Sequence, residues 1–295
     1  MQPILELVIA GLALGGIYAL LAFAMSITIS TTRILNLSHG VFFVWGAAVF
    51  VMLTQYWKVP LVLAVPILLA FFIGTAFLFQ WGVVRVLLGK PTHFLLIGSI
   101  LATFGLALSM ESVLGHAWVT FVDPFPQFSL SLAVFRVDLG GVAISGSRLV
   151  ILALVLVLVL GFHFFLHRTF LGKAARAMAQ SYDGFLIIGL NPYRVTTILF
   201  TVAIVATAIS GAFYVLALPL DPYMGPPLTL KSFTVVILAG VGSLPGTLIA
   251  GAILGLAEVF TALLLGDIWA PVVSLAILFT VLLVRPTGLF GKGEY

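Results

Sequence analysis

The fold class of this chain is decided by the stretch ILALVLVLVL, residues 151–160, which is an unbroken run of aliphatic side chains. It lies inside a longer apolar run over 149–167. A helix rises about 1.5 Å per residue and a membrane span needs about 20 apolar residues, so a run of this length can cross a bilayer. A strand of a membrane barrel would instead alternate apolar and polar residues. The stretch therefore predicts a transmembrane helix.

Apolar runs recur on both sides of this stretch. The candidate membrane segments are 5–29, 40–56, 60–84, 92–114, 149–167, 194–218, 230–242, 244–265 and 269–284. The segment 230–242 is too short for a full span, which predicts a half-helix or a re-entrant element. The first segment has no basic residue before it and is longer than the apolar region of about 7–15 residues in a cleavable signal, so we expect it to stay as a membrane helix. We expect an all-α integral membrane protein with about eight transmembrane helices plus broken or re-entrant half-helices, in a single domain over 1–295.

The composition agrees with a chain that lives in lipid. Hydrophobic residues make up 62% of the 295 residues and charged residues only 7%, whereas a soluble domain is about 25% charged. Thirteen basic and nine acidic side chains are too few to cover a globule of this size, which excludes a water-soluble enzyme or binding module. The chain has no cysteine, so disulfides, thiol catalysis and thiolate metal sites are excluded as well.

The basic residues predict the orientation, because cytoplasmic loops carry an excess of Lys and Arg. The densest basic group lies in the connection over 168–193 and at its edge, and consists of Arg168, Lys173, Arg176 and Arg194. If this connection is cytoplasmic, nine basic residues lie inside, and four lie outside: Lys58, Arg136, Arg148 and Lys231. We therefore expect an external N-terminus, a cytoplasmic C-terminus and an external excursion over 115–147. Alternation within 128–137 suggests a small hairpin or an interfacial element there.

Two polar interruptions stand out among the apolar runs. The first is RILNLSHG at 33–40, and the second is LAGVGSLPG at 238–246. Paired breaks in the two halves of a transporter indicate a translocation site built by discontinuous helices. The alternative is that both are ordinary loops at the membrane surface. Glu258 is the one acid well inside an apolar run, where it serves either a structural hydrogen bond or a role in the pathway or a subunit interface.

The connection over 168–193 contains a short segment of high helix propensity, 173–180, in which most side chains are small. Gly189 and the pair Asn191-Pro192 prevent it from continuing into the next span. A short helix with small residues and a basic edge, held outside the membrane, is suited to docking a soluble partner.

The residues of this connection resemble a known family. The pattern Gly-x-x-x-Arg-Ala-x-Ala at 172–179, followed by Gly-Leu-Asn at 189–191, is similar to the cytoplasmic coupling loop of ABC importer permeases of the branched-chain amino acid type. Asn-Leu-Ser-His-Gly at 36–40, the glycine-rich break at 240–246 and the ending Arg-Pro-x-Gly-Leu-Phe-Gly at 285–291 are similar to further segments of that family, in the same order. The resemblance covers about residues 10–291. The length and the short start resemble the LivH-type subunit more than the LivM-type subunit.

The resemblance implies a permease subunit that moves branched-chain or other hydrophobic amino acids by ATP-driven alternating access in the bacterial inner membrane. The implied partners are a second, LivM-type permease subunit, two ATP-binding subunits that hold ATP and Mg, and an extracytoplasmic solute-binding protein. Alternatives are an importer of the same family for urea, short amides or small carboxylates, an ion-coupled secondary carrier, and a non-transport membrane scaffold. The scarcity of buried acids disfavours the carrier, and the scaffold leaves the exposed small-residue helix without a role.

The resemblance also implies site residues. The residues that would shape coupling to the ATPase are Gly172, Arg176, Ala177, Ala179 and Gly189. The candidates for the translocation pathway or its gates are Asn36, Ser38, His39, Gly40, Gly240, Gly242, Ser243, Pro245 and Gly246, to which its position in the apolar run adds Glu258. One departure from the family is Phe185, where a small residue is usual.

No catalytic residue, metal or cofactor is expected in this chain. The sequence contains no P-loop motif, Gly-x-x-x-x-Gly-Lys-(Ser/Thr). The pair Gly291-Lys292 lacks both the upstream glycine and the following hydroxyl residue of that motif. We therefore expect ATP to be hydrolysed by separate subunits.

Overall fold

The computed structural model describes residues 2–87, 90, 92–123, 136–139, 142–187 and 189–291. The helices are α1 (Gln2–Thr32), α2 (His39–Val51), α3 (Leu61–Phe79), α4 (Arg85–Leu87), α5 (Thr92–Phe121), α6 (Gly146–Arg168), α7 (Phe170–Gln180), α8 (Tyr182–Ile187), α9 (Pro192–Tyr214), α10 (Gly225–Ala239), α11 (Leu244–Leu265) and α12 (Ala270–Val284). Two π-helical turns, η1 (Met52–Tyr56) and η2 (Gln80–Val84), extend α2 and α3, and two 3-10 turns, η3 (Pro222–Met224) and η4 (Asp267–Trp269), precede α10 and α12.

Eight helical segments are long and apolar enough to cross a membrane. They are Ile4–Thr32, His39–Tyr56, Leu61–Leu87, Phe94–Phe121, Gly146–Arg168, Pro192–Tyr214, Leu244–Leu265 and Asp267–Val284. Each corresponds to one of the full-length segments predicted from the sequence. Most of the segment 230–242 falls in α10, which ends at Ala239, is 15 residues long and is not among the eight. The predicted all-α, multi-pass membrane fold with a shorter broken element is confirmed.

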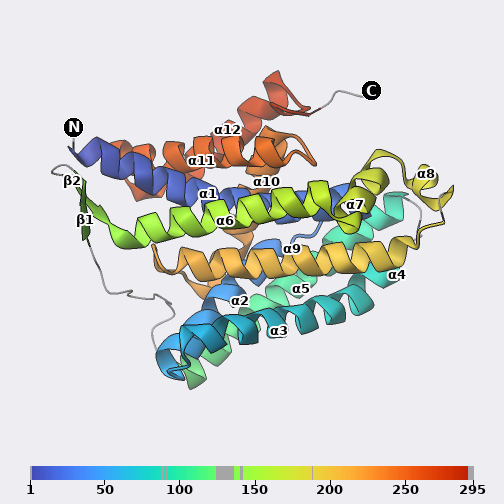
Figure 1. Ribbon diagram of the computed structural model, residues 1–295, viewed down its shortest axis with the longest axis horizontal. Helices are drawn as coiled ribbons and strands as arrows, with labels where there is room; N and C mark the ends of the chain where they lie inside the picture. Colours follow the sequence, from blue (N-terminus) through green and yellow to red (C-terminus); the bar gives the residue numbers. More distant parts are fainter. Residues whose placement is uncertain are drawn as a thin grey trace.

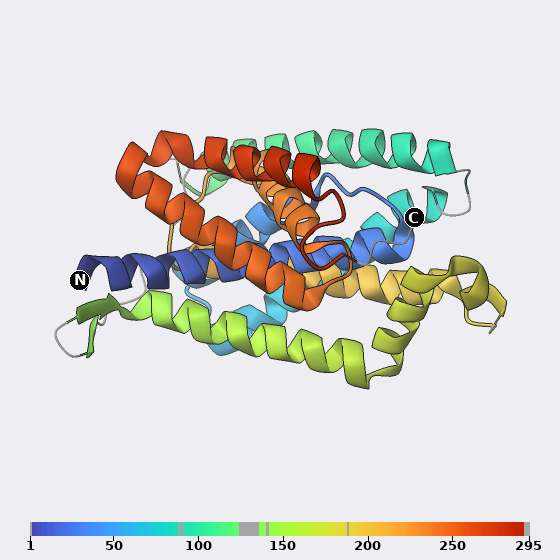
Figure 2. The same ribbon diagram turned by 90° about the horizontal axis from the view of Figure 1, so that it is seen from above.

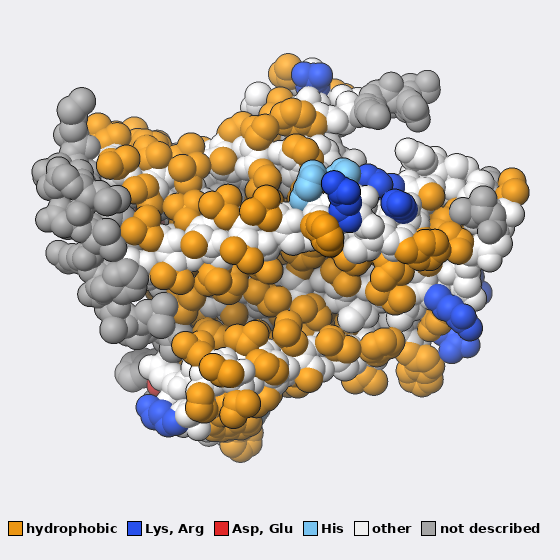
Figure 3. Space-filling view, in the orientation of Figure 1, with side chains coloured by type: hydrophobic (Ala, Val, Ile, Leu, Met, Phe, Trp, Pro, Cys, Tyr) orange, Lys and Arg blue, Asp and Glu red, His pale blue; other side chains and the backbone are white. Residues whose placement is uncertain are grey.

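The helices lie side by side along the long axis of the molecule, which gives it two ends (Figure 1, Figure 2). The N-terminus and the strands β1 (Arg136–Leu139) and β2 (Val142–Ser145) lie at one end, here called the N-terminal end. The short helices α7 and α8 lie at the opposite end, here called the α7 end. Apolar side chains cover much of the surface between the ends (Figure 3). Within the membrane helices, Leu101 of α5 and Val157 of α6 are 67% and 65% exposed. Exposure of such residues is expected where lipid is the solvent.

The expected external excursion over 115–147 is described only in part. Its first residues, to Phe121, belong to α5, which is longer than the segment predicted from the sequence. β1 and β2 pair antiparallel, with Arg136 opposite Ser145 and Leu139 opposite Val142. A small hairpin therefore exists, but it includes only the last two residues of the predicted range 128–137. The rest of that range lies outside the described residues.

Helices α1 and α11 are packed through glycines. Gly11 and Gly15 of α1 face Gly251 and Gly255 of α11, and a Cβ atom at Gly255 would overlap the Gly11 carbonyl oxygen and the backbone of Gly15. Both pairs have the i, i+4 spacing that lets helix backbones approach closely in membranes. Gly11 lies against Gly255 and Gly15 lies against Gly251, so residue numbers rise along α1 as they fall along α11, and the two helices are antiparallel. The α1–α11 pair is the most extensive helix contact of the described chain.

The N-termini of α2 and of the half-helix α10 meet inside the bundle. The connection after α1 turns back into the bundle, and its Ile34, Asn36 and Ser38 are buried (Figure 2). The backbone N–H of Gly40 donates to Thr229 Oγ1 at 2.9 Å, and a Cβ at Gly40 would overlap the carbonyl oxygen of Gly225. From this contact α2 runs to the N-terminal end and α10 to the α7 end. At about 1.5 Å per residue α10 is about 22 Å long, too short to cross the membrane.

Candidate functional site

Four polar side chains from four helices meet in the interior. Glu258 Oε2 accepts hydrogen bonds from Tyr18 Oη at 2.8 Å and from Lys231 Nζ at 2.9 Å, and Ser274 Oγ donates to Glu258 Oε1 at 2.5 Å. Lys231 Nζ also donates to Tyr18 Oη at 2.9 Å. We call these four residues the Lys–Glu cluster. Side chains tilt toward the N-terminus of their own helix, so in the antiparallel α1–α11 pair Tyr18 and Glu258 reach toward each other.

The Lys–Glu cluster lines a cavity of about 640 Å³ that lies between α1, α10, α11 and α12. The end of α9 at Tyr214 and the connection from α9 to α10 also line this cavity. Tyr18 is 16 residues from the start of α1 and 14 from its end, so the cluster lies near the middle of that helix. The lining residues of α1 run from Leu7 to Tyr18, and none follows Tyr18. Arg148 and Asp267, at the N-terminal end, also line the cavity. The cavity therefore extends from the N-terminal end to mid-bundle.

The rest of the cavity wall is largely aliphatic. The apolar lining residues of α1 and α11 are Leu7, Ala10, Ala13, Leu14, Ile17, Val259, Ala262 and Leu263. Near the mouth, Arg148 forms an ion pair with Glu6 at 2.9 Å, in which both side chains remain partly exposed. The cavity thus has an apolar wall and a charged inner end.

Lys231 differs from its expected place. The sequence predicted it on the external side, but its side chain is 17% exposed and pairs with Glu258. The reason is that α10 begins inside the bundle, so a residue two turns into it cannot lie in an external loop. For Glu258 the three hydrogen bonds that it accepts fit the structural alternative. It also lines the cavity, and its role in the pathway stays a prediction.

The predicted pathway residues of 36–40 form a compact network at the start of α2. Asn36 Oδ1 accepts from the backbone N–H of Ser38 at 3.0 Å and from Ser38 Oγ at 2.6 Å, and Asn36 Nδ2 lies 3.2 Å from His39 Nδ1. Asn36, Ser38 and His39 are all at most 1% exposed. His39 Nε2 is buried without a hydrogen-bond partner among the described residues. The network fixes the entry of the chain into α2 and brings Gly40 to α10.

The predicted break at 240–246 lies at the α7 end, between α10 and α11. Gly240 and Gly242 have φ of +88° and +85°, which glycine adopts without strain. Ser243 Oγ caps α11 by accepting from the backbone N–H of Gly246 at 3.1 Å, and Pro245 occupies an early helical position where its missing N–H costs nothing. The break ends one helix and starts the next.

The C-terminal segment packs on this break. The backbone N–H groups of Leu289 and Phe290 donate to the carbonyl oxygens of Leu238 and Ala239 at 2.8 and 3.1 Å, at the C-terminus of α10. A Cβ at Gly240 would lie 2.5 Å from the backbone N of Gly291. Two segments that the sequence singled out separately, 240–246 and 285–291, therefore form one structural unit.

The structure does not bring the two predicted breaks together. The N-terminal half of α10 contacts Gly40, and the break at 240–246 follows its other end, about 20 Å away at the rise of a helix. The segment that meets 36–40 is instead Gly225–Thr229, which the sequence analysis did not single out. A glycine and a threonine four residues apart were the available signal, because the backbone of Gly40 lies against Gly225 and its N–H donates to the hydroxyl of Thr229.

The predicted coupling residues divide between the two faces of α7. Arg176 and Ala179 are exposed and Ala177 is half-buried, whereas Gly172 is buried and a Cβ there would overlap the backbone of α6. Thr169 caps α7 by accepting from the backbone N–H of Gly172 at 3.1 Å. Gly189 has a φ of +74° and makes the turn after α8.

Phe185 of α8 is 1% exposed and packs with Ala174, Ala175 and Met178 of α7. It therefore anchors α8 from the inside and does not lie on the exposed face of α7.

The comparisons with known proteins agree with this architecture. The family model described as the permease component of branched-chain amino acid transport systems matches residues 7–283. The chain belongs to this family.

Curated relatives of this permease match over nearly their full length. The high-affinity branched-chain amino acid transport system permease protein BraD of Pseudomonas aeruginosa is 26% identical, over 98% of the chain and 96% of that protein. The corresponding LivH protein of Escherichia coli strain K12 is 27% identical, over 96% of the chain and 94% of that protein. A probable LivH protein of Methanocaldococcus jannaschii is 23% identical, over 92% of the chain and 88% of that protein. No solved structure matches the chain.

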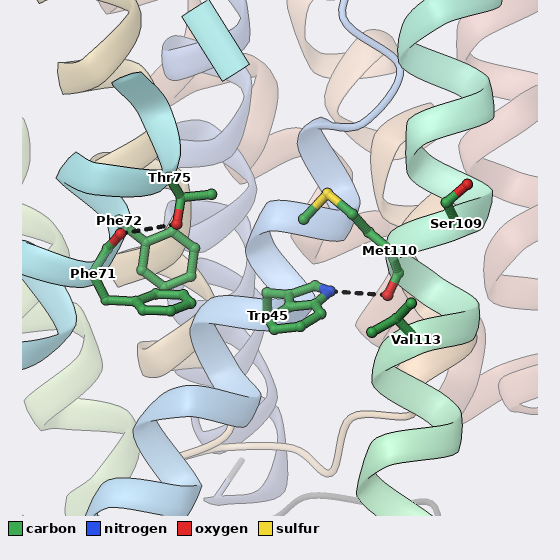
Figure 4. A pocket seen from close by; sticks show the side chains of 7 residues that line it. All are labelled: Trp45, Phe71, Phe72, Thr75, Ser109, Met110 and Val113. Atoms are coloured by element: carbon green, nitrogen blue, oxygen red, sulfur yellow. Dashed lines mark hydrogen bonds between the residues drawn. The ribbon is translucent and has the colours of Figure 1, made fainter. Parts of the chain in front are cut away.

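A second cavity of the permease, of about 360 Å³, lies between α3 and α5 (Figure 4). Trp45 of α2 lies between the two helices, and its indole N–H donates to the carbonyl oxygen of Met110 at 3.1 Å. The hydroxyls of Thr75 and Ser109 donate to backbone carbonyls of their own helices. No charged side chain lines this cavity. It offers an apolar gap without a group that could orient a charged ligand.

The described residues hold no group of three or more His, Asp or Glu side chains that could bind a metal ion.

Proposed function

We propose that this permease is the membrane subunit of an ATP-driven importer that moves branched-chain or other hydrophobic amino acids into the cytoplasm by alternating access. The observation that carries the proposal is the family match over 7–283, which covers six candidate spans completely and all but the outermost residues of the first and last. The cavity at the N-terminal end and the exposed helix α7 at the opposite end support it, because an importer needs a substrate entry on one side and a motor contact on the other.

The proposed location is the bacterial inner membrane, with the α7 end in the cytoplasm. The basic residues at that end are Arg33, Arg85, Lys90, Arg168, Lys173, Arg176, Arg194 and Arg285. Lys58, Arg136 and Arg148 lie at the N-terminal end. This excess supports a cytoplasmic C-terminus and an external N-terminus.

The orientation is testable with single cysteines, because the chain has none of its own. Trp57→Cys at the N-terminal end and Val241→Cys at the α7 end replace side chains that are 62% and 54% exposed. In intact cells, a membrane-impermeant maleimide is expected to label Trp57→Cys only, and in inside-out vesicles Val241→Cys only. The reverse labelling pattern would contradict the proposed orientation.

The proposed partners are a second, LivM-type permease subunit, two ATP-binding subunits and an extracytoplasmic solute-binding protein. ATP and Mg would be bound by the ATP-binding subunits, and this chain would hydrolyse nothing. Arg176, Ala177 and Ala179 would meet the ATP-binding subunit from the outer face of α7, while Gly172 and Gly189 would fix the position of α7 and α8. The whole chain, 1–295, would act as a single permease domain.

Co-purification tests the assembly. Purified from its native host, the tagged permease is expected to bring down two ATP-binding chains and one further permease. The purified complex in liposomes is expected to import leucine only when ATP and the binding protein are both present. Leucine uptake by this chain alone, driven by an ion gradient, would show a secondary carrier instead.

We further propose that the contact between α2 and α10 is a gate of the pathway and that 240–246 moves with it. Asn36, Ser38, His39 and Gly40 would form one side of the gate. Gly240, Gly242, Ser243, Pro245 and Gly246 would form the hinge at the cytoplasmic end of α10. The support is that the N-terminus of the half-helix α10 meets that of α2 at mid-bundle, and discontinuous helices build the substrate sites of many transporters.

This gate predicts state-dependent accessibility of His39→Cys. His39 is 0% exposed, so labelling is expected to be at background level in the resting complex and to rise during ATP-driven transport. Trp57→Cys, which replaces a side chain that is 62% exposed at the N-terminal end and outside the proposed gate, is the control and is expected to be labelled in both states. Protection of His39→Cys in every transport state would contradict the gate.

A further inference from the structure

Of the two ion pairs between described side chains, Lys231–Glu258 is the buried one. The side chain of Glu258 is 5% exposed and that of Lys231 is 17% exposed. Ionisable side chains are costly within a membrane span, and where they occur they mark functional sites by default. A purely structural contact between α10 and α11 could be made by apolar residues at no such cost. The pair therefore calls for a ligand that needs both charges.

The hydrogen bonds leave the pair open to such a ligand. A lysine ammonium has three N–H donors, and two of them meet Tyr18 Oη and Glu258 Oε2. Lys231 lines the cavity with the rest of its exposed surface. On the carboxylate, Tyr18 and Ser274 donate from α1 and α12, so Glu258 stays fixed by two neutral donors when Lys231 turns to another partner.

The chemistry of the cavity matches one class of ligand. An amino acid with a branched aliphatic side chain has a carboxylate and an ammonium at one end and an apolar group at the other. The cavity has a cation and an anion 2.9 Å apart at its inner end and an aliphatic wall along α1 and α11. Its volume of about 640 Å³ is ample for such a molecule, since small-molecule sites commonly enclose about 300–1,000 Å³.

We infer that the Lys–Glu cluster is the site at which the permease holds the charged head of the amino acid in transit. Lys231 binds the α-carboxylate, and Glu258, steadied by Tyr18 and Ser274, binds the α-ammonium. The inference rests on the proposed function and adds to it the residues that contact the substrate.

The net charge of the site explains how it can both accept and release its ligand. The empty site holds a neutral ion pair, and a zwitterion adds no net charge to it. Binding exchanges one ion pair for two of the same kind, so the differences in free energy are small compared with the cost of burying a lone charge. The site therefore binds weakly, as a conduit requires, while it excludes ligands that have only one of the two charges.

The test uses single cysteines in the complex of the permease with its partner permease and ATP-binding subunits, without binding protein. Ala262→Cys lies in the cavity wall. Leu265→Cys, on the same helix and 64% exposed, lies outside the cavity lining and is the matched control. At a leucine concentration about ten times Kd, leucine is expected to slow maleimide labelling of Ala262→Cys about tenfold. Labelling of Leu265→Cys is expected to stay unchanged.

Two analogues separate head-group recognition from filling of an apolar cavity. 4-Methylpentanoate has no ammonium and 3-methylbutylamine has no carboxylate, and neither is expected to protect Ala262→Cys at the concentration at which leucine does. Equal protection by both analogues would overturn the inference whatever the variants below show.

Substitutions in the pair separate a binding role from a structural one. Glu258→Gln keeps the shape of the side chain and one acceptor oxygen, and its amide N–H can donate to the hydroxyl of Tyr18 or Ser274 that loses its acceptor. With Ala262→Cys it is expected to assemble but to lose protection by leucine. The exchange Lys231→Glu with Glu258→Lys keeps an ion pair and provides a second variant. It is expected to assemble and to lose protection too, because the reversed head would turn the aliphatic group away from the apolar wall. Full protection in either assembled variant would overturn the inference.

Leucine uptake by the complete transporter separates this inference from the proposed function. Uptake without protection of Ala262→Cys would overturn the site alone. Absence of leucine uptake by the unsubstituted transporter would overturn the proposed function and the inference with it.

Discussion

Replacing Gly255 by leucine is expected to abolish stable assembly of the permease. A Cβ at residue 255 would overlap the carbonyl oxygen of Gly11 and the backbone of Gly15, and neither backbone can turn aside as a side chain could. The helices would have to separate along the most extensive contact of the described chain, which also carries Tyr18 and Glu258 toward each other. Overpacking in well-packed cores costs about 1–3 kcal/mol and occasionally more, and we expect the upper end here.

The matched control is Gly161→Leu. Gly161 lies in the α6 span, and a Cβ there would meet nothing within 4 Å. This variant adds the same side chain to the same kind of helix, so its stability is expected to stay within about 0.5 kcal/mol of the unsubstituted protein.

Size-exclusion chromatography of heated, detergent-solubilised samples measures both variants. Gly255→Leu is expected to yield little folded protein or to lose its folded peak at a much lower temperature, while Gly161→Leu follows the unsubstituted protein. Equal thermal stability of Gly255→Leu and the unsubstituted protein would show that α1 and α11 do not pack through these glycines.

The membrane spans could be predicted from the sequence because each one is a long local feature. An apolar run such as 149–167 contains its own evidence, and the shortness of 230–242 correctly indicated a half-helix. The two faces of α7 also follow from local helix spacing. Arg176 and Ala179 are three residues apart and share the exposed face, and Ala174, Ala175 and Met178 share the buried face.

The contacts that build the candidate site could not be predicted in the same way, because their residues are far apart in the sequence. Gly40 and Thr229 are 189 positions apart, and Tyr18 and Lys231 are 213 positions apart. The count of basic residues treated Lys231 as part of a loop, since nothing local shows that α10 begins inside the bundle. The isolated acid Glu258 was a usable signal, because a buried carboxylate needs a cationic partner.

The same limitation explains why the sequence predicted that the two breaks act as a pair, although the structure keeps them apart. Residues 33–40 and 238–246 are both polar and rich in turn residues, so they look equivalent in the sequence. One enters the middle of the bundle, whereas the other holds the C-terminal segment through Leu289 and Phe290. The role of each break depends on the segment that packs against it, and that segment lies elsewhere in the sequence.

Charge reversal at Arg176 is expected to uncouple transport from ATP hydrolysis. Arg176 is exposed on α7 and has no described hydrogen bond or ion pair, so Arg176→Glu leaves the fold intact. If α7 docks on the ATP-binding subunit, reversal of a charge in the interface opposes that contact. Loss of a charge pair buried in an interface costs about 2–5 kcal/mol, so we expect leucine uptake to fall by at least about tenfold.

Ala179→Trp tests the same face by bulk instead of charge. Ala179 is exposed, so the indole does not disturb the packing of α7 on Phe185, but it would hold the docking surfaces apart. Lys58→Glu is the control for both variants, since it makes the same change of charge at the N-terminal end and is expected to leave coupling unchanged. Uptake and substrate-stimulated ATP hydrolysis in proteoliposomes measure the effect. Both activities are expected to be lost in the two α7 variants while the subunits still insert into the membrane, and retention of both activities there would exclude α7 as the coupling helix.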